Sequence, residues 1–154
     1  MKDKVFGFDK PEQSPGLLLW QTTITWQRQI KKSLDPYNIS HAQFVIMAVT
    51  LWFENNKHDV TQIMIIRQSK LDKMTVSKSL KKLVSVGLVK RMEDKSDTRA
   101  KAVFLTKKGR DLISNLVPIV EGIDRDFFGA IKKSEQQSLI KMLNHMITNF
   151  GSEI

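Results

Sequence analysis

The segment Asp72–Thr106, DKMTVSKSLKKLVSVGLVKRMEDKSDTRAKAVFLT, decides the fold because its hydrophobic pattern changes period halfway along. Asp72 is a favourable helix N-cap, and Gly87 is favourable just beyond a helix C-terminus, so a helix is predicted between them. The apolar stripe of this helix is predicted to consist of Val76, Leu80, Leu83 and Val84. The opposite face carries Met74, Lys78, Lys81, Lys82 and Ser85, with Thr75 and Ser77 at its flanks.

A β-hairpin is predicted directly after this helix. The runs LVKRM (88–92) and AVFL (102–105) are rich in β-branched and aromatic residues and enclose a polar loop. Thr106 is then a suitable N-cap for a long helix. A short helix is expected at 61–68, just before the helix that follows Asp72. Two short helices followed by a hairpin indicate a helix-turn-helix with a β-wing.

Longer helices are predicted on both sides of this unit. The pattern predicts helices at about 17–34 and 41–55, a long helix from 107 to about 131 that contains Pro118, and a last helix at about 135–149. Ser40 should cap the second helix, which is apolar nearly all round and is therefore expected at the buried centre. Ser134 with Gln137 is a capping-box pattern for the last helix. The predicted fold class is mainly α (α+β), after a turn-rich arm at residues 1–16.

The positive charge of the chain is concentrated in one segment. Residues 70–110 hold thirteen Lys or Arg and four Asp or Glu, whereas the other residues hold twelve of each, so the whole net charge of +9 lies there. A localised basic segment is typical of a protein that binds a polyanion, most often nucleic acid. The weaker interpretations are an ordinary solvated surface and a membrane or acidic-protein partner.

Composition excludes several classes of protein and site. The chain has no cysteine, which excludes disulfides, thiolate zinc sites and cysteine nucleophiles and fits a cytoplasmic protein. No apolar run is long enough for a membrane span, and no signal peptide is expected at the N-terminus. No Gly-rich phosphate loop or nucleophile elbow is present, and Asp124 and Asp126 are interpreted as a solvated helix face, so no enzyme and no cofactor are predicted.

The basic helix and the hairpin loop are the expected contacts with double-stranded DNA. The N-terminal part of a recognition helix meets base edges in the major groove, while lysines further along it contact phosphates. An arginine in a wing loop suits the narrow minor groove, and Asp97 is expected to orient a cation, either Arg91 or Arg99. The predicted DNA-binding residues are Met74, Thr75, Ser77, Lys78, Lys81, Lys82, Arg91, Lys95, Asp97, Arg99 and Lys101. The alternative for the helix is an ordinary solvated face.

The sequence resembles the MarR family of winged helix-turn-helix transcription regulators. The resemblance is carried by TVS (75–77), GLV.R (87–91), Asp97 and Arg99, and LT (105–106) with Gly109. SPGLLLW (14–20), Gln43 with Phe44, and the helix of Pro118 leading to SEQQSLIKML are also similar, so the resemblance spans about residues 14–147.

The resemblance implies a homodimer that binds a pseudo-palindromic operator. Residues 17–38 and 107–154 would form the dimerisation helices, and 39–106 the winged helix-turn-helix domain. Interface candidates are Phe8, Leu139, Leu143, Met146 and Phe150, whose alternative is an intrachain core.

Family members often bind small aromatic or anionic effectors between the dimerisation region and the winged domain. The matching residues here are Trp20, Thr23, Ile24, Gln27, His41, Phe44 and Val45, each of which has plain core packing as its alternative.

The leading hypothesis is thus a dimeric, sequence-specific transcription regulator, a repressor released by an effector. One alternative is a metal-responsive regulator, supported only by His41, His58 with Asp59, and His145, which lack a metal-ligand spacing, so no metal site is predicted. The other alternative is a non-specific nucleic-acid-binding protein, which would share the basic segment but not distinguish a palindrome from random DNA.

Overall fold

The computed structural model describes residues 5–93 and 101–151, and this part of the chain is mainly helical, as predicted. Two short 3-10 turns, Pro11–Gln13 and Asp35–Tyr37, flank the first helix. The helices and strands are α1 (Pro15–Leu34), α2 (His41–Asn55), α3 (Gln62–Ser69), α4 (Lys73–Ser85), β1 (Val89–Glu93), β2 (Lys101–Leu105), α5 (Lys107–Phe128) and α6 (Lys133–Phe150).

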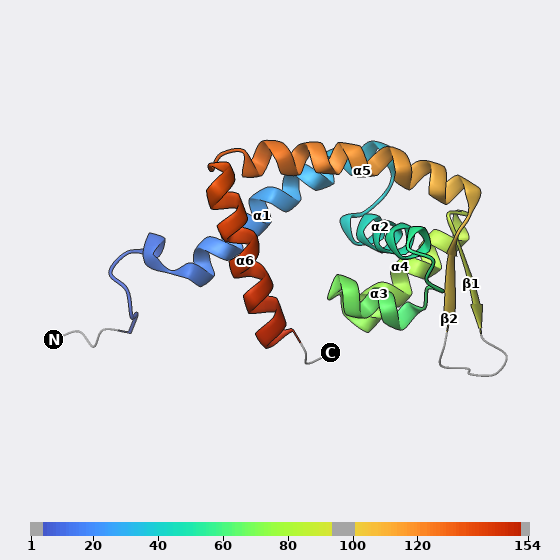
Figure 1. Ribbon diagram of the computed structural model, residues 1–154, viewed down its shortest axis with the longest axis horizontal. Coiled ribbons are helices and arrows are strands. Elements are labelled where there is room, and N and C mark those ends of the chain that lie inside the picture. The colour runs from blue at the N-terminus through green and yellow to red at the C-terminus, as the bar shows by residue number, and fades with distance from the viewer. Residues whose placement is uncertain (1–4, 94–100, 152–154) are drawn as a thin grey trace.

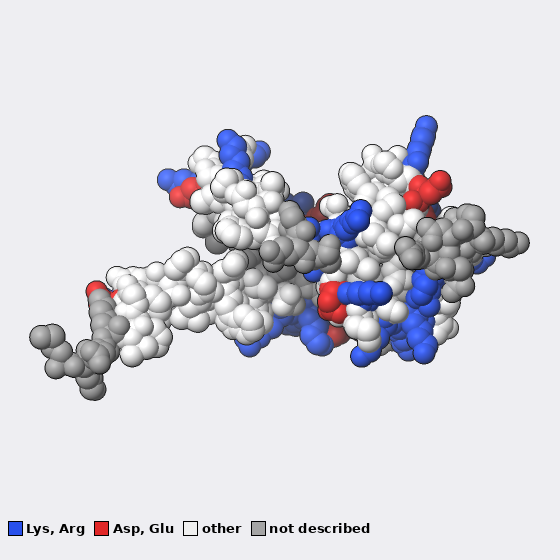
Figure 2. Space-filling model, turned by 90° about the horizontal axis from the view of Figure 1, so that it is seen from below, with Lys and Arg blue, Asp and Glu red and all other residues white. Residues whose placement is uncertain are grey.

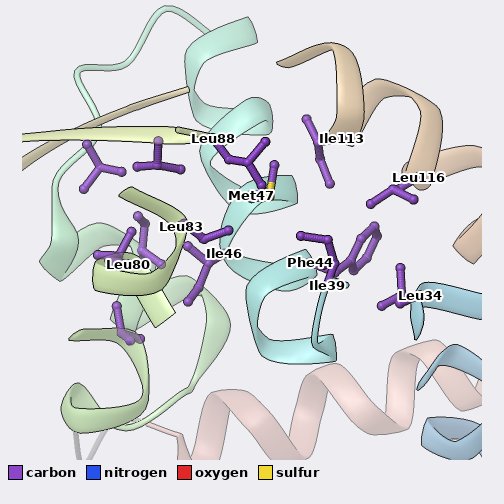
Figure 3. Packing of buried hydrophobic residues seen from close by; sticks show 14 of the residues in the cluster. Leu34, Ile39, Phe44, Ile46, Met47, Leu80, Leu83, Leu88, Ile113 and Leu116 are labelled. Atoms are coloured by element: carbon purple, nitrogen blue, oxygen red, sulfur yellow. The ribbon is translucent and has the colours of Figure 1, made fainter. Parts of the chain in front are cut away.

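Helix α2 lies at the centre of the hydrophobic core, as its apolar composition predicts. Ile46 and Met47 are fully buried, and α2 packs against α1, α3, α4, α5 and β2. Figure 3 shows Leu80 and Leu83 of α4 on one side of α2, and Ile113 and Leu116 of α5 on the other side. The core is therefore one cluster that runs from the helix-turn-helix through α2 to the long helices.

The predicted N-caps Ser40, Asp72 and Thr106 are confirmed. Each side chain accepts a hydrogen bond from a backbone N–H of the first helical turn of α2, α4 or α5. The starting points of these three helices are thus determined by neighbouring residues. Gly87 has φ +74, so it takes the left-handed conformation that its predicted position after a helix requires.

Four details of the predicted helices are wrong. Helix α1 begins earlier, at Pro15, because Ser14 caps it and proline is well suited to the first turn. Helix α5 ends earlier, at Phe128, and Gly129 caps it. The cap of α6 is Lys132 with Glu135, not Ser134 with Gln137.

The fourth error concerns α4, where Val84 is 41% exposed and does not belong to the buried stripe. The buried residues of α4 are Val76, Leu80 and Leu83, which follow one narrow face at helical spacing.

Strands β1 and β2 form an antiparallel hairpin that packs on the domain through Val89 and Val103, both buried. Beside it, Thr61 forms an isolated antiparallel bridge with Ala102, and the Val103 amide donates to the Val60 carbonyl at 2.9 Å. The segment before α3 therefore adds one bridge to the edge of the two-stranded sheet, and the sequence did not predict it because a single bridge leaves no periodic pattern.

Helices α1, α5 and α6 extend away from this compact part. Figure 1 shows α5 running along the top of the molecule, with α1 beside it and α6 descending from its far end. Helices α1 and α5 pack on each other, whereas α6 makes no extensive contact with another described element and has no buried residue. Pro118 lies inside α5, as predicted.

One polar link ties α2 to the wing and to α5. The Glu54 carboxylate forms an ion pair with Arg110 of α5 and accepts a hydrogen bond from the Leu105 amide of β2 at 3.0 Å. Glu54 is largely buried, with 15% of its side chain exposed, so this pair is shielded from solvent on one side. These two interactions of Glu54 hold the end of β2 and the start of α5 against the C-terminal end of α2.

Gly109 permits the close approach of α5 to the turn before β1. A Cβ atom at this position would lie 1.9 Å from the Leu88 carbonyl oxygen, which belongs to backbone and cannot move aside freely. We expect Gly109→Ala to lower the free energy of unfolding by about 1–3 kcal/mol, measured by urea denaturation.

Gly122→Ala is the matched control, since it lies in the same helix with only the Arg125 guanidinium near, at 3.7 Å. It should raise the free energy of unfolding by about 0.5–1 kcal/mol, because alanine favours the helix. Equal stability of the two variants would show that the packing at Gly109 is looser than the structure has it.

Candidate nucleic-acid interface

Helix α4 is anchored by its N-cap and by its buried face. The Asp72 carboxylate accepts from the Thr75 amide at 2.8 Å and from the Thr75 hydroxyl at 2.6 Å. These two hydrogen bonds hold the pKa of Asp72 below its ordinary value, so the cap stays ionised. The cap and the buried stripe together present a fixed outer face of α4 to solvent.

The outer face of α4 is cationic. Lys78, Lys81 and Lys82 are exposed on it, and within the described residues no salt bridge joins them to an acidic side chain. Figure 2 shows Lys and Arg side chains gathered on the underside of the molecule, on the side of α3, α4 and the strands. Uncompensated like charges on one face favour a polyanionic partner there.

The predicted residues of α4 differ in what they offer a partner. Met74 is 65% exposed, and Ser77 is half-buried at the edge of the outer face. Thr75 is half-buried, and its hydroxyl proton is committed to Asp72, so this side chain can only accept a further hydrogen bond.

The wing carries two further predicted residues within the described part of the chain. Arg91 on β1 and Lys101 on β2 are both half-buried. The Nη1 atom of Arg91 is buried and has no hydrogen-bond partner among the described residues. The other predicted wing residues, Lys95, Asp97 and Arg99, lie outside the described residues.

A second candidate site is a pocket of about 700 Å³ between α1 and the start of α2. It brings together three of the predicted effector residues, Ile24, Gln27 and His41. The sequence analysis missed the polar and basic residues that also line it: Arg28, Lys31, Asp35, Asn38 and Ser40. Arg28 and Lys31 lie four and seven positions after Ile24, so the helical period places them on one face with it.

The other predicted effector residues do not line this pocket. Phe44 is 8% exposed and belongs to the core, and Trp20 is 66% exposed near the N-terminus of α1. Thr23 and Val45 are half-buried and also absent from the lining. The pocket is therefore nearer the C-terminal end of α1 than the sequence analysis placed it.

Three helices meet at the edge of this pocket through polar side chains. The Trp26 indole donates to Oδ1 of Asp124 at 2.7 Å, so Asp124 is not the solvated residue that the sequence suggested. The His41 ring packs edge-on against Trp26, with ring centroids 5.2 Å apart. Burial lowers the pKa of His41 below its ordinary value of 6.5, and the nearby Asp124 carboxylate opposes this shift only in part.

The described residues offer neither a metal site nor a membrane-spanning helix. Within residues 5–93 and 101–151, no three His, Cys, Asp or Glu side chains are grouped so that they could hold a metal ion. In the same residues, no helix is both long and apolar enough to span a membrane.

A capped recognition helix followed by a two-stranded wing defines the winged helix-turn-helix class of fold. The sequence profile of the "ArnR1-like, winged-helix domain" matches residues 35–122, more than half of the chain. A curated relative, the uncharacterized HTH-type transcriptional regulator YdcH of Bacillus subtilis (strain 168), is 34% identical over 140 residues, covering 90% of this chain and 95% of that protein. The chain therefore belongs to the winged-helix family of HTH-type transcriptional regulators.

Solved structures show that the resemblance to the MarR family extends to the whole fold. A mutant MarR from Escherichia coli complexed with operator DNA has a TM-score of 0.74 at 21% identity and covers 86% of this chain and 92% of its own. CouR from Rhodococcus jostii RHA1 bound to p-coumaroyl-CoA has a TM-score of 0.78 at 19% identity, covering 96% of this chain and 99% of its own.

Proposed function

We propose that this transcriptional regulator is a cytoplasmic homodimer that binds a pseudo-palindromic operator and represses by occluding a promoter. The observation that carries the proposal is the exposed lysine face of α4, which forms no salt bridge within the described part of the chain and is held in place by the cap and the core. A helix of this kind fits the major groove of B-DNA, which is about 12 Å wide. The complex of a MarR mutant with operator DNA supports DNA binding by this fold.

The residues are assigned by their position on α4 and the wing. Ser77 and Lys78, with Met74 and Thr75, would meet base edges near the N-terminal end of α4, and Lys81 and Lys82 would contact phosphates. Arg91 and Lys101 would approach the backbone from the wing strands. Lys95, Asp97 and Arg99 are assigned from the sequence alone, with Arg99 in the minor groove.

Selection from random duplex DNA at near-physiological salt tests this function directly. A dimer should enrich an inverted repeat whose half-sites lie about ten base pairs apart, because the two recognition helices would be about 34 Å apart. Salt-sensitive binding without an enriched sequence would instead support a non-specific nucleic-acid-binding protein.

Lys81→Ala should weaken binding to the selected operator and to random DNA by a similar factor. Loss of one phosphate contact in each protomer should also reduce the slope of log affinity against log salt by about one per protomer. Lys133→Ala is the matched control, because Lys133 is an exposed lysine at the start of α6, on the far side of the molecule from the wing (Figure 1). Equal slopes for both variants would contradict the assignment of Lys81.

Homodimerisation is proposed because α1 and α6 leave apolar side chains uncovered. The N-terminal part of α1 is uncharged from Gln13 to Gln27, and its exposed residues include Leu18, Leu19 and Trp20. On α6, Ile140, Met142, Met146, Ile147 and Phe150 are exposed. Large apolar side chains that are exposed in groups on two helices favour an interface. We assign 17–38 and 107–154 to the dimerisation region, 39–106 to DNA binding, and 1–16 to an arm that could join the interface.

Charges placed on the apolar face of α6 should separate the dimer. We expect Ile140→Glu combined with Ile147→Glu to give the mass of a single 17.7 kDa chain in light scattering, because two carboxylates would be buried per protomer. The control combines Gln137→Glu with Asn144→Glu, which adds the same charge with the same spacing at exposed polar positions of α6. A dimer that survives in both double variants would place the interface elsewhere.

A small aromatic or anionic effector is proposed to bind the pocket at α1 and to release the operator. The pocket combines apolar Ile24 and Ile39 with the cationic Arg28 and Lys31, which suits an amphipathic anion. Lys31 is already bonded to Asp35 at 2.8 Å, which leaves Arg28 as the available cation of the lining. The bound ligand in the CouR structure supports effector binding on this fold.

Isothermal titration with a panel of aromatic carboxylates, beginning with benzoate and cinnamate, tests the pocket. For a ligand that binds, Arg28→Ala should weaken binding by about 10- to 100-fold, because a charge-assisted hydrogen bond is lost. Lys32→Ala is the control, since Lys32 is an exposed cation of the same helix outside the lining. Ligand binding that is insensitive to Arg28→Ala would place the effector at another site.

A further inference from the structure

Met74 is an apolar side chain at the end of a stripe of lysines. It is the second residue of α4, and Lys78 and Lys81 follow it at spacings of four and seven residues, which place all three on one face. Met74 is 65% exposed, whereas Val76, Leu80 and Leu83 on the opposite face are fully buried. The methionine thus points away from the core of its own chain.

Packing within residues 5–93 and 101–151 does not account for this exposure. Met74 is neither a member of the hydrophobic core nor among the partly buried side chains packed on it. The uncovered apolar surface proposed for dimerisation belongs to α1 and α6, whereas Met74 belongs to α4. A partner that covers Met74 must therefore be the one that covers the neighbouring lysines, which is DNA if the proposed function is correct.

Beside Met74, Lys73 is an exposed cation, whereas Thr75 and Asp72 offer a base no side-chain donor. The Thr75 hydroxyl donates to Asp72, and the Asp72 carboxylate is fully exposed and keeps its negative charge through its hydrogen bonds with Thr75. Lysines of α4 therefore lie on both sides of Met74, with Lys73 before it and Lys78 after it. A contact through Met74 itself depends on shape and apolar surface, because its side chain donates no hydrogen bond.

The major groove displays one apolar group, the 5-methyl of thymine. Methionine is unbranched and polarizable and adapts to the shape of a small apolar partner. We propose that Met74 contacts the 5-methyl group of a thymine in each half-site, so that α4 selects an A·T pair at that position. This inference rests on the proposed function, and it identifies Met74 as a specificity-determining residue.

Replacement of thymine by deoxyuridine tests the inference, since it removes the methyl group and leaves base pairing intact. Each thymine of the selected operator is replaced in turn, in one half-site and then in both, and affinity is measured by fluorescence anisotropy. With the parent protein, replacement at one thymine position should lower the affinity about fourfold in one half-site and about 15-fold in both. These factors correspond to the lost burial of one or two methyl groups. With Met74→Ala, the same replacement should change affinity less than twofold.

Met92→Ala is the matched control. Met92 is 61% exposed but lies on strand β1 of the wing, and the minor groove that a wing would approach displays no thymine methyl. This variant should keep the full deoxyuridine effect. Met74→Leu should keep most of it, and Met74→Gln should lose it, which separates apolar contact from side-chain length.

The outcomes distinguish the two proposals. If the parent binds a selected operator but no deoxyuridine position distinguishes it from Met74→Ala, the inference is overturned and the proposed function stands. If the parent enriches no sequence at all, the proposed function fails first. Circular dichroism and urea denaturation of Met74→Ala verify folding, and the exposure of Met74 predicts an unchanged unfolding midpoint.

Discussion

The packing of five other elements around α2 is the constraint on which the rest of the structure depends, and only the part of α2 near Trp52, which is 55% exposed, stays open to solvent. α4 and the wing pack against it from one direction, and α1 and α5 pack against it from the other. Close-packed interiors transmit displacement rather than absorb it. A shift of α1 against α5 must therefore be passed through α2 to α4. In the proposed dimer, this single core would give a ligand at the α1 pocket a physical route to the spacing of the two copies of α4.

The same constraint explains where polar groups are tolerated inside the molecule. Glu54 at the end of α2 is largely buried, yet both of its oxygens are occupied, one by Arg110 and the other by the Leu105 amide. At the other end of α2, the His41 ring packs on Trp26 of α1, whose indole donates to Asp124 of α5. The C-terminal end of α2 thus has a direct polar link to α5, whereas its start is joined to α5 through Trp26.

The fold could be predicted from the sequence wherever the determinant is local. The caps at Ser40, Asp72 and Thr106, the turn at Gly87 and the apolar pattern of α2 are confirmed because each depends on neighbouring residues. The predictions are wrong where contacts between residues far apart in the sequence determine the structure. The bridge of Thr61 to Ala102 and the bond of Trp26 to Asp124 join segments that no periodicity relates. The full lining of the pocket beside α1 could not be predicted for the same reason, since residues 35–40 contribute its far wall.

The uncovered surfaces of the chain are of two chemical kinds, apolar and cationic. They lie on different helices, which indicates a different partner for each. The N-terminal half of α1 and the outer side of α6 are apolar with few charges, which suits a second copy that presents the same surface. The outer face of α4 is cationic, which would oppose self-association through like-charge repulsion and favours a polyanion. Met74 is the exception that belongs to neither kind, because an apolar residue among lysines gains nothing from phosphates. A partner that combines dense negative charge with apolar groups at fixed positions would explain its exposure. The major groove of thymine-containing DNA has both properties.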